Sequence, residues 1–321
     1  LAPLAAAAAH IGEPDQWRHD PPTADRNPEA LLTFLHYWRP MRTPYEIECI
    51  RIATHRAIPA HRAAERAFRA GASEYETLLA FLAACRFTEN ELPYPAIIAQ
   101  NAHAAVLHYQ HYAREPGARD SLLIDAGCAC NGYASDISRT YGGGDPEFVA
   151  LIDGMDELQQ RLAARVTPGI GFGELHAAAH HEIGKLLQTA GIVDAAFADP
   201  VGAGITAAFF PHGLGHFLGL QVHEVGGDLA DTAGNQLARP DGFPNLRLVR
   251  TLEPGQVLTI EPGLYFIGAL LDKLRTGPAG DAIDWQRVNH LRRFGGIRIE
   301  DNVLVTETGH ENLTRRAFDT T

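Results

Sequence analysis

An Asn131-Gly132 pair between two apolar runs, residues 121–125 and 134–138, is the feature that most constrains the fold of this chain. Asn-Gly between such runs predicts a two-residue β-hairpin turn, because both residues accept the positive φ that the turn requires. The turn also fixes the pairing of the two strands, so that Asp125 lies opposite Ser138. We therefore expect an antiparallel hairpin with one defined register.

This hairpin would bring Asp125 and Asp136 to the same face, because side chains alternate along a strand with a period of two. Diagonal neighbours on one face have their Cβ atoms roughly 7 Å apart. Two carboxylates at this separation repel each other unless a cation lies between them. The alternative is a pair of solvated surface acids, but the apolar residues 122–124 favour a hairpin in the interior.

The composition is that of a globular protein, with 45% apolar and 21% charged residues and a formal net charge of −12. An acidic chain is a poor nucleic-acid binder, because contacts to phosphate require Lys and Arg. No apolar run is long enough to span a membrane. Four cysteines in 321 residues do not make a disulfide framework, and they favour a reducing cytoplasm.

Cap and turn signals predict three helices, then strands, then two helices, then strands again. Helices are expected at about 28–38, 44–69, 74–86, 146–166 and 173–190. Further strands are expected at 95–99, 105–109, 257–260 and 297–305. Pro59 is expected to kink the second helix. This order predicts one α+β domain.

A second motif places His212, His216 and His223 in one short, glycine-rich stretch. The glycines predict a loop with close backbone approaches rather than a helix. The first His is not followed by the Glu of a helical zinc-peptidase motif. An isolated His is usually structural, but three so close together favour a functional loop.

Two glutamates complete the candidate set. Glu261 closes an apolar strand just before a Pro-Gly turn, and Glu300 lies in an apolar strand two residues after Arg298. Either one could be a residue at the rim, since a buried Glu needs a partner. Two Asp, two Glu and one His together form a set of hard oxygen donors, which favours Mn²⁺ over Zn²⁺. Four carboxylates balance two divalent cations.

These motifs, in this order, resemble those of the pita-bread metallopeptidases, the family of methionine aminopeptidase, aminopeptidase P and prolidase. The resemblance implies an α+β pita-bread fold, in which two pseudo-symmetric halves surround a curved antiparallel sheet. It implies that two metal ions are bound, with Co²⁺ or Zn²⁺ as alternatives to Mn²⁺. The metal ligands that it assigns are Asp125, Asp136, His216, Glu261 and Glu300.

The resemblance also assigns residues around the metals. His212 and His223 match histidines that support the metals and contact the substrate, and His108 matches a histidine on the substrate side. Tyr94 matches more loosely a Tyr near the first Asp. Arg298 would hold the C-terminal carboxylate of a short peptide, or would instead orient Glu300.

The long segment between Glu261 and Glu300, together with residues 101–109 and 295–302, resembles the bacterial Xaa-Pro dipeptidases. This branch implies that a hydroxide held between two metals attacks the scissile carbonyl, that His223 polarises this carbonyl, and that Glu261 moves the proton. Aminopeptidase P and organophosphorus acid anhydrolase activities are alternatives on the same site. A non-catalytic binding module is a third.

The branch further implies a homodimer in the cytoplasm that acts on small peptides and binds neither nucleic acid nor membrane. Residues 1–9 lack the basic residue that precedes the apolar core of a signal peptide, and residues 10–26 have the composition of a linker. We expect residues 1–40 to be a remnant of an N-terminal domain with its linker. Residues 41–321 are expected to form the catalytic domain.

Overall fold

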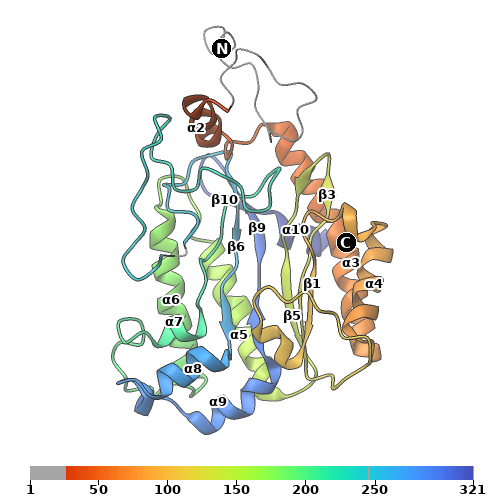
Figure 1. The fold of residues 1–321 in the computed structure, drawn as a ribbon, viewed down its shortest axis with the longest axis vertical. Coiled ribbons are helices and arrows are strands. Elements are labelled where there is room, and N and C mark those ends of the chain that lie inside the picture. The colour runs from red at the N-terminus through yellow and green to blue at the C-terminus, as the bar shows by residue number, and fades with distance from the viewer. Residues whose placement is uncertain (1–26, 245, 321) are drawn as a thin grey trace.

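The computed structural model describes residues 27–244 and 246–320 (Figure 1). The expectations for residues 1–26, a linker and no signal peptide, lie outside the described residues. None of the described helices combines the length and the apolar character that crossing a bilayer would require.

The first three helices lie where the cap signals predicted them, but the first follows Pro28 and has no side-chain cap. They are α2 (Glu29–Trp38), α3 (Pro44–Ala70) and α4 (Glu74–Cys85). At the start of α3 the side chain of Thr43 accepts from the N–H of Glu46, and the carboxylate of Glu46 accepts from the N–H of Thr43. Such capping boxes satisfy backbone N–H groups that have no partner within the helix. Helix α3 continues through Pro59 as one element.

The predicted hairpin is present with the predicted register. The strands around it are β1 (Ile97–Gln100), β2 (Ser121–Asp125), β3 (Ala129–Cys130), β4 (Tyr133–Ala134) and β5 (Ser138–Gly142). Asn131 and Gly132 both have positive φ, and Asp125 pairs with Ser138. The second strand of the hairpin is interrupted between β4 and β5, so Asp136 lies in the break.

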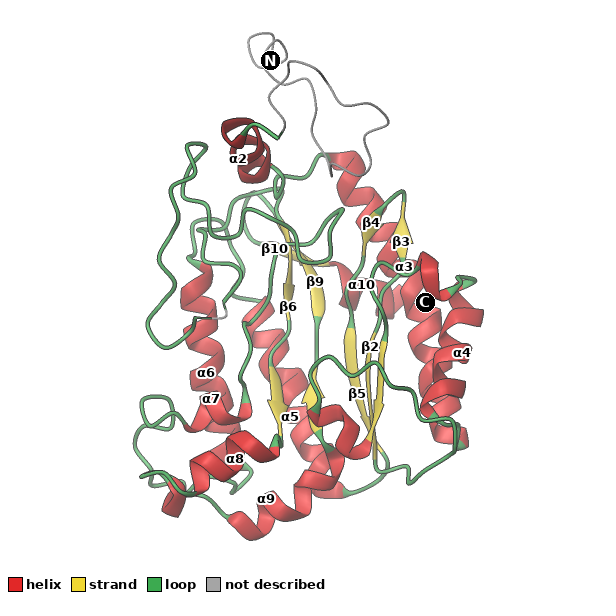
Figure 2. Ribbon diagram, in the orientation of Figure 1, coloured by secondary structure: helices red, strands yellow, loops and turns green. Residues whose placement is uncertain are grey.

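A second group of strands lies beside the first (Figure 2). Its members are β6 (Val257–Ile260), β7 (Gly263–Tyr265), β8 (Gly296–Arg298), β9 (Asp301–Val305) and β10 (His310–Asn312). Strand β9 pairs with β6 and β10, and β7 pairs with β8, all antiparallel. A backbone bridge between Ser138 and Glu300 joins the two groups.

Helices cover both sides of the strands, with α3 and α4 on one side and α6, α7 and α8 on the other (Figure 1). The remaining helices are α5 (Pro146–Ala163), α6 (Phe172–Thr189), α7 (Ile205–Phe209), α8 (Gly268–Arg275), α9 (Trp285–Leu291) and α10 (Leu313–Thr320). One apolar cluster joins α5 and α6 to the second group of strands, and another joins α3 and α4 to the first. The α+β prediction is therefore confirmed.

Two predicted strands are wrong in detail. Residues 105–109 form no strand. Ala105 ends the 3-10 helix η3 (Asn101–Ala105), and residues 106–109 continue in a loop whose two ends hydrogen-bond to one buried side chain, Glu74. The expected strand 297–305 is divided into β8 and β9. It breaks at Glu300 because the N–H of this residue bonds to the carbonyl of Ser138 in the other group of strands.

The hairpin leaves no room for a side chain at Gly127. A Cβ atom there would lie 1.8 Å from the carbonyl oxygen of Ser135. Gly127→Ala should therefore lower the free energy of unfolding by about 1–3 kcal/mol or more, the usual cost of overpacking. Urea denaturation measures this change. Gly117→Ala is the matched control, since nothing lies within 4 Å of its Cβ position, and we expect a change within about 0.5 kcal/mol. Equal changes in the free energy of unfolding for Gly127→Ala and Gly117→Ala would contradict the tight packing of the hairpin.

Candidate metal centre and active site

A cleft of about 840 Å³ opens where the two groups of strands meet. All ten residues that the sequence singled out line it: Tyr94, His108, Asp125, Asp136, His212, His216, His223, Glu261, Arg298 and Glu300. They come from segments far apart in the chain, so the fold brings the sequence motifs together at one place.

The predicted ligands lie at strand ends or in strand breaks. Asp125 ends β2, Glu261 follows β6, and Asp136 and Glu300 occupy the breaks described above. In such places the backbone is released from the sheet and the side chain can turn into the cleft. The alternative of two solvated surface acids is wrong, because Asp136 is only 5% exposed.

His216 reaches the centre on a loop that runs along β6. Its N–H bonds to the hydroxyl of Thr259 at 3.2 Å, and its carbonyl accepts from the N–H of Thr259 at 2.9 Å. A Cβ atom at Gly215 would lie 2.0 Å from the carbonyl oxygen of Thr259. The glycine is therefore required for the close approach of the loop to the strand.

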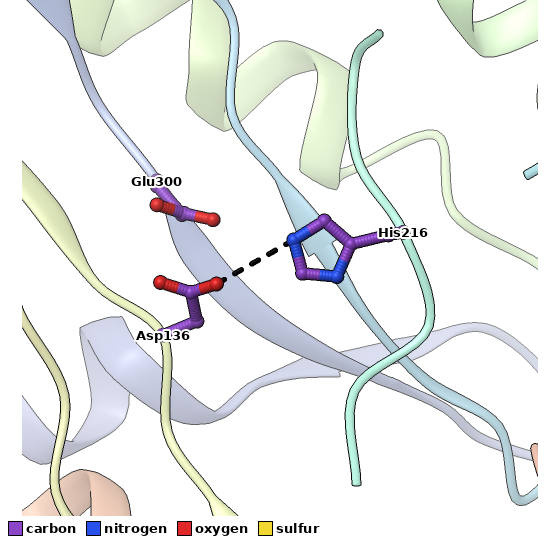
Figure 3. A group of neighbouring side chains, drawn as sticks. All are labelled: Asp136, His216 and Glu300. Atoms are coloured by element: carbon purple, nitrogen blue, oxygen red, sulfur yellow. Dashed lines mark ion pairs between the residues drawn. The ribbon is translucent and has the colours of Figure 1, made fainter. Parts of the chain in front are cut away.

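Asp136, His216 and Glu300 form the inner cluster, and each offers a ligand atom within 4.8 Å of the others (Figure 3). The Nε2 atom of His216 lies 3.5 Å from a carboxylate oxygen of Asp136 and 3.5 Å from one of Glu261. Its Nδ1 atom is 3.0 Å from the carbonyl of Phe217, which can only accept. Nδ1 therefore donates to this carbonyl, and Nε2 is the ring atom that faces the carboxylates and would bind a cation there.

The charges of this centre require a counterion. Burial raises the pKa of Asp125 to about 6 and that of Glu261 to about 7, and it raises the pKa of Glu300 well above its usual value. The neighbouring carboxylates contribute to all three shifts. Burial would also raise the pKa of Asp136, but the imidazole of His216 outweighs it and lowers this pKa. Four carboxylates and one imidazole nitrogen fit two divalent cations, which would remove the repulsion.

Arg298 is buried and fully engaged by protein groups. It donates to Asp125 at 2.6 Å, to the hydroxyl of Ser138 at 3.0 Å and to that of Tyr265 at 2.9 Å. Ser138 in turn donates to Glu300 at 2.7 Å. These contacts favour the orienting role of Arg298 over a contact with a substrate carboxylate.

His212 stands at the end of the same network. Its Nδ1 atom donates to the carbonyl of Gly213 at 2.8 Å, so Nε2 accepts from the hydroxyl of Tyr265 at 2.9 Å. Burial and the positive charge of Arg298 lower the pKa of His212 to about 3. His212 is therefore neutral. Tyr265 was missed by the sequence analysis, because nothing in the motif Glu-Pro-Gly indicates the tyrosine that follows it.

The remaining predicted residues surround the centre. Tyr94 donates to Asp125 at 2.9 Å, and the ring of His223 lies 4.4 Å from that of His216. Burial lowers the pKa of His223 to about 4. His108 lines the cleft from the loop after η3.

Two further arginines, Arg239 and Arg247, line the cleft and were missed. Arg239 donates to the carbonyl of Leu246 and to Asp228. Arg247 is exposed and makes no ion pair or hydrogen bond among residues 27–244 and 246–320. It lies near enough to His223 to contribute to its lowered pKa. No sequence signal distinguishes it from other surface arginines.

Known proteins match this chain over most of its length. It is 50% identical over 294 residues to the Xaa-Pro dipeptidase of Aeromonas hydrophila subsp. hydrophila, and the match covers 91% of this chain and 67% of that protein. It is 47% identical to the Xaa-Pro dipeptidase of Shewanella amazonensis, with 91% of this chain and 66% of that protein covered.

Solved structures with a similar fold cover most of this chain. A substituted form of Escherichia coli aminopeptidase P in complex with substrate superposes with a TM-score of 0.70 at 29% identity, over 89% of this chain and 59% of that chain. The aminopeptidase PepP of Pseudomonas aeruginosa superposes with a TM-score of 0.70 at 28% identity, over 92% of this chain and 60% of that chain. The chain thus spans about three-fifths of these structures.

The fold and the carboxylate-rich centre define a metallopeptidase with the pita-bread fold, and the prediction of this fold is confirmed. The sequence pattern of metallopeptidase family M24 matches residues 48–307. The chain belongs to metallopeptidase family M24, as its motifs predicted.

The ligand assignment predicts the effect of Asp136→Asn on metal binding. We expect the unaltered chain to bind two equivalents of Mn²⁺ in isothermal titration calorimetry, and the variant to lose at least one, because an amide is a weaker ligand without charge. Thermal unfolding of the metal-free variant should stay cooperative, since Asn has the size of Asp and keeps the backbone hydrogen bond to Asn302. Asp153→Asn, an exposed position on α5, is the matched control. An unchanged stoichiometry in Asp136→Asn would contradict the assignment.

Proposed function

We propose that this chain hydrolyses Xaa-Pro dipeptides with two divalent cations held by Asp125, Asp136, His216, Glu261 and Glu300. The observation that carries the proposal is the convergence of all five side chains on one cleft that a small peptide can enter. The similarity to Xaa-Pro dipeptidases over 91% of the chain supports the choice of substrate.

The bound cations would polarise the scissile carbonyl and lower the pKa of a water molecule. Glu261 then takes a proton from the attacking water and returns it to the prolyl nitrogen of the leaving group. This nitrogen carries no hydrogen in the substrate, so a positioned proton donor is needed. His223, whose ring packs against that of His216, donates a hydrogen bond to the carbonyl oxygen as negative charge develops there.

We assign the substrate carboxylate to Arg247 rather than to Arg298. All three groups that Arg298 contacts belong to the protein, and its role is to orient Asp125 and, through Ser138, Glu300. Arg247 lines the cleft with an exposed guanidinium that is free to form a charge-assisted hydrogen bond. Neutral His212 and Tyr265 hold Arg298 in place.

The long segment between Glu261 and Glu300 favours a dipeptidase over aminopeptidase P, because it resembles the corresponding segment of the bacterial Xaa-Pro dipeptidases. This segment contains β7, α8, α9 and β8. Identity to the dipeptidases is 47–50%, against 28–30% to the solved aminopeptidases P. A binding module without catalysis is disfavoured, since no predicted ligand has been replaced.

Further proposals follow from the similarity to the bacterial Xaa-Pro dipeptidases. Mn²⁺ is the proposed metal because the centre offers four carboxylates and one imidazole. A cytoplasmic location is supported by Cys49, Cys85, Cys128 and Cys130, which are all free thiols. A homodimer would cover exposed apolar side chains on α2 and α3, such as Trp38 at 48% and Tyr45 at 63% exposure. We also retain the proposal of a catalytic domain over residues 41–321.

Steady-state assays with Mn²⁺ test the proposed function. We expect the chain to cleave Ala-Pro efficiently, Ala-Pro-Ala much less well, and a fluorophosphate weakly or not at all. A preference for the tripeptide would indicate aminopeptidase P, and a preference for the fluorophosphate would indicate an organophosphorus acid anhydrolase. Metal bound without any turnover would favour the binding module.

The assignment of Arg247 predicts a loss that depends on the charge of the substrate. Arg247→Ala should lower kcat/KM for Ala-Pro by about 10- to 150-fold, the value of a charge-assisted hydrogen bond of about 1.5–3 kcal/mol. It should affect Ala-Pro amide much less, because the amide has no charge to hold. Arg66→Ala, at an exposed position of α3, is the control. Equal losses on acid and amide would contradict the assignment.

A further inference from the structure

Outside the cleft, one buried carboxylate has an unusual number of partners. Glu74, the first residue of α4, is 1% exposed and accepts four hydrogen bonds. One of its oxygens accepts from the N–H of Gln100 at 2.7 Å and from Nδ1 of His103 at 2.7 Å. The other accepts from the hydroxyl of Tyr109 at 2.8 Å and from the N–H of Ala113 at 2.7 Å.

These four donors belong to a single segment, residues 100–113. Gln100 and Ala113 are its two ends, so one carboxylate closes the base of the loop. The cleft residues Leu107, His108 and Gln110 lie between the ends. Tyr109 directly follows His108, and its ring stacks on that of His103 with 4.6 Å between the centroids.

A carboxylate suits this position better than any other side chain. Four donors require two oxygens that each accept twice, and the amide of Gln offers one such oxygen only. Two of the donors are backbone N–H groups, which cannot turn to another partner. Glu74 is not needed to cap α4, because Glu76 accepts from the N–H of Ser73 at 2.8 Å. Its side chain therefore serves the loop and not the helix.

We propose that Glu74 is a positioning residue, which fixes the loop 100–113 so that His108 and its neighbours form one wall of the peptide-binding cleft. This inference rests on the proposed function, because it gives His108 a peptide substrate to contact. Glu74 itself touches neither substrate nor metal; it acts through Tyr109 and the two backbone groups at the base of the loop.

A double-mutant cycle tests the inference. Glu74→Gln should lower kcat/KM for Ala-Pro by about tenfold, as expected when hydrogen bonds to a charged group are lost. The effect should fall mainly on KM, with unchanged Mn²⁺ stoichiometry. In a His108→Ala background the same substitution should cause no further loss. Glu76→Gln, two residues away on the same helix, is the matched control and should stay within about twofold.

A full additional loss in the His108→Ala background, or loss of metal in Glu74→Gln, would overturn the inference. Tyr109→Phe removes one of the four hydrogen bonds and keeps the ring, so it provides a milder variant if Glu74→Gln does not fold. We expect it to change KM in the same direction by a smaller factor. An unchanged KM in Tyr109→Phe would also count against the role.

Hydrogen exchange separates this inference from the proposed function. In the chain without substrate, amides of residues 100–113 should exchange faster in Glu74→Gln than in Glu76→Gln or the unaltered chain. Equal exchange in all three would overturn the positioning role. Failure of the unaltered, Mn²⁺-loaded chain to cleave Ala-Pro would overturn the proposed function and leave this exchange experiment unaffected.

Discussion

Asp125, Asp136, Glu261 and Glu300 place four carboxylates in one buried cleft, and their mutual repulsion has to be balanced within the structure. The chain supplies only part of the opposite charge. Arg298 pairs with Asp125, and the imidazole of His216 faces two of the other acids. Divalent cations would relieve the remaining repulsion, so metal binding would be coupled to the stability of the folded site.

The ligands are held by networks that extend well beyond the cleft. Glu224, next to His223, is fully buried and pairs with Arg39 at 2.8 Å and with Arg42 at 3.0 Å. Both arginines precede residue 48, where the match to the family begins. The segment between α2 and α3 therefore supports the histidine loop. Removing both arginines would leave the buried charge of Glu224 uncompensated, which costs several kcal/mol in typical cases.

The sequence predicted features whose causes are local. The Asn131-Gly132 turn fixed the hairpin register because a two-residue turn allows one pairing, and capping residues marked the first helices because they satisfy their own backbone. The loop 105–109 was wrongly expected to be a strand. Its apolar residues suit a strand, but the backbone groups of Gln100 and Ala113, which flank it, bond to Glu74, a residue that no local pattern connects to them.

By itself the sequence determined the candidate ligand types, their order, the hairpin that carries two of them and the family, because these follow from side-chain chemistry and short-range spacing. Only the tertiary structure decided what each charged residue contacts. Arg298 was predicted close to Glu300, yet its contacts with Tyr265 and Ser138 could not be predicted, because these residues reach it from other strands. Arg247 and Glu74 carry no sequence signal, because the function of a lone charged side chain is set by the partners that folding places around it.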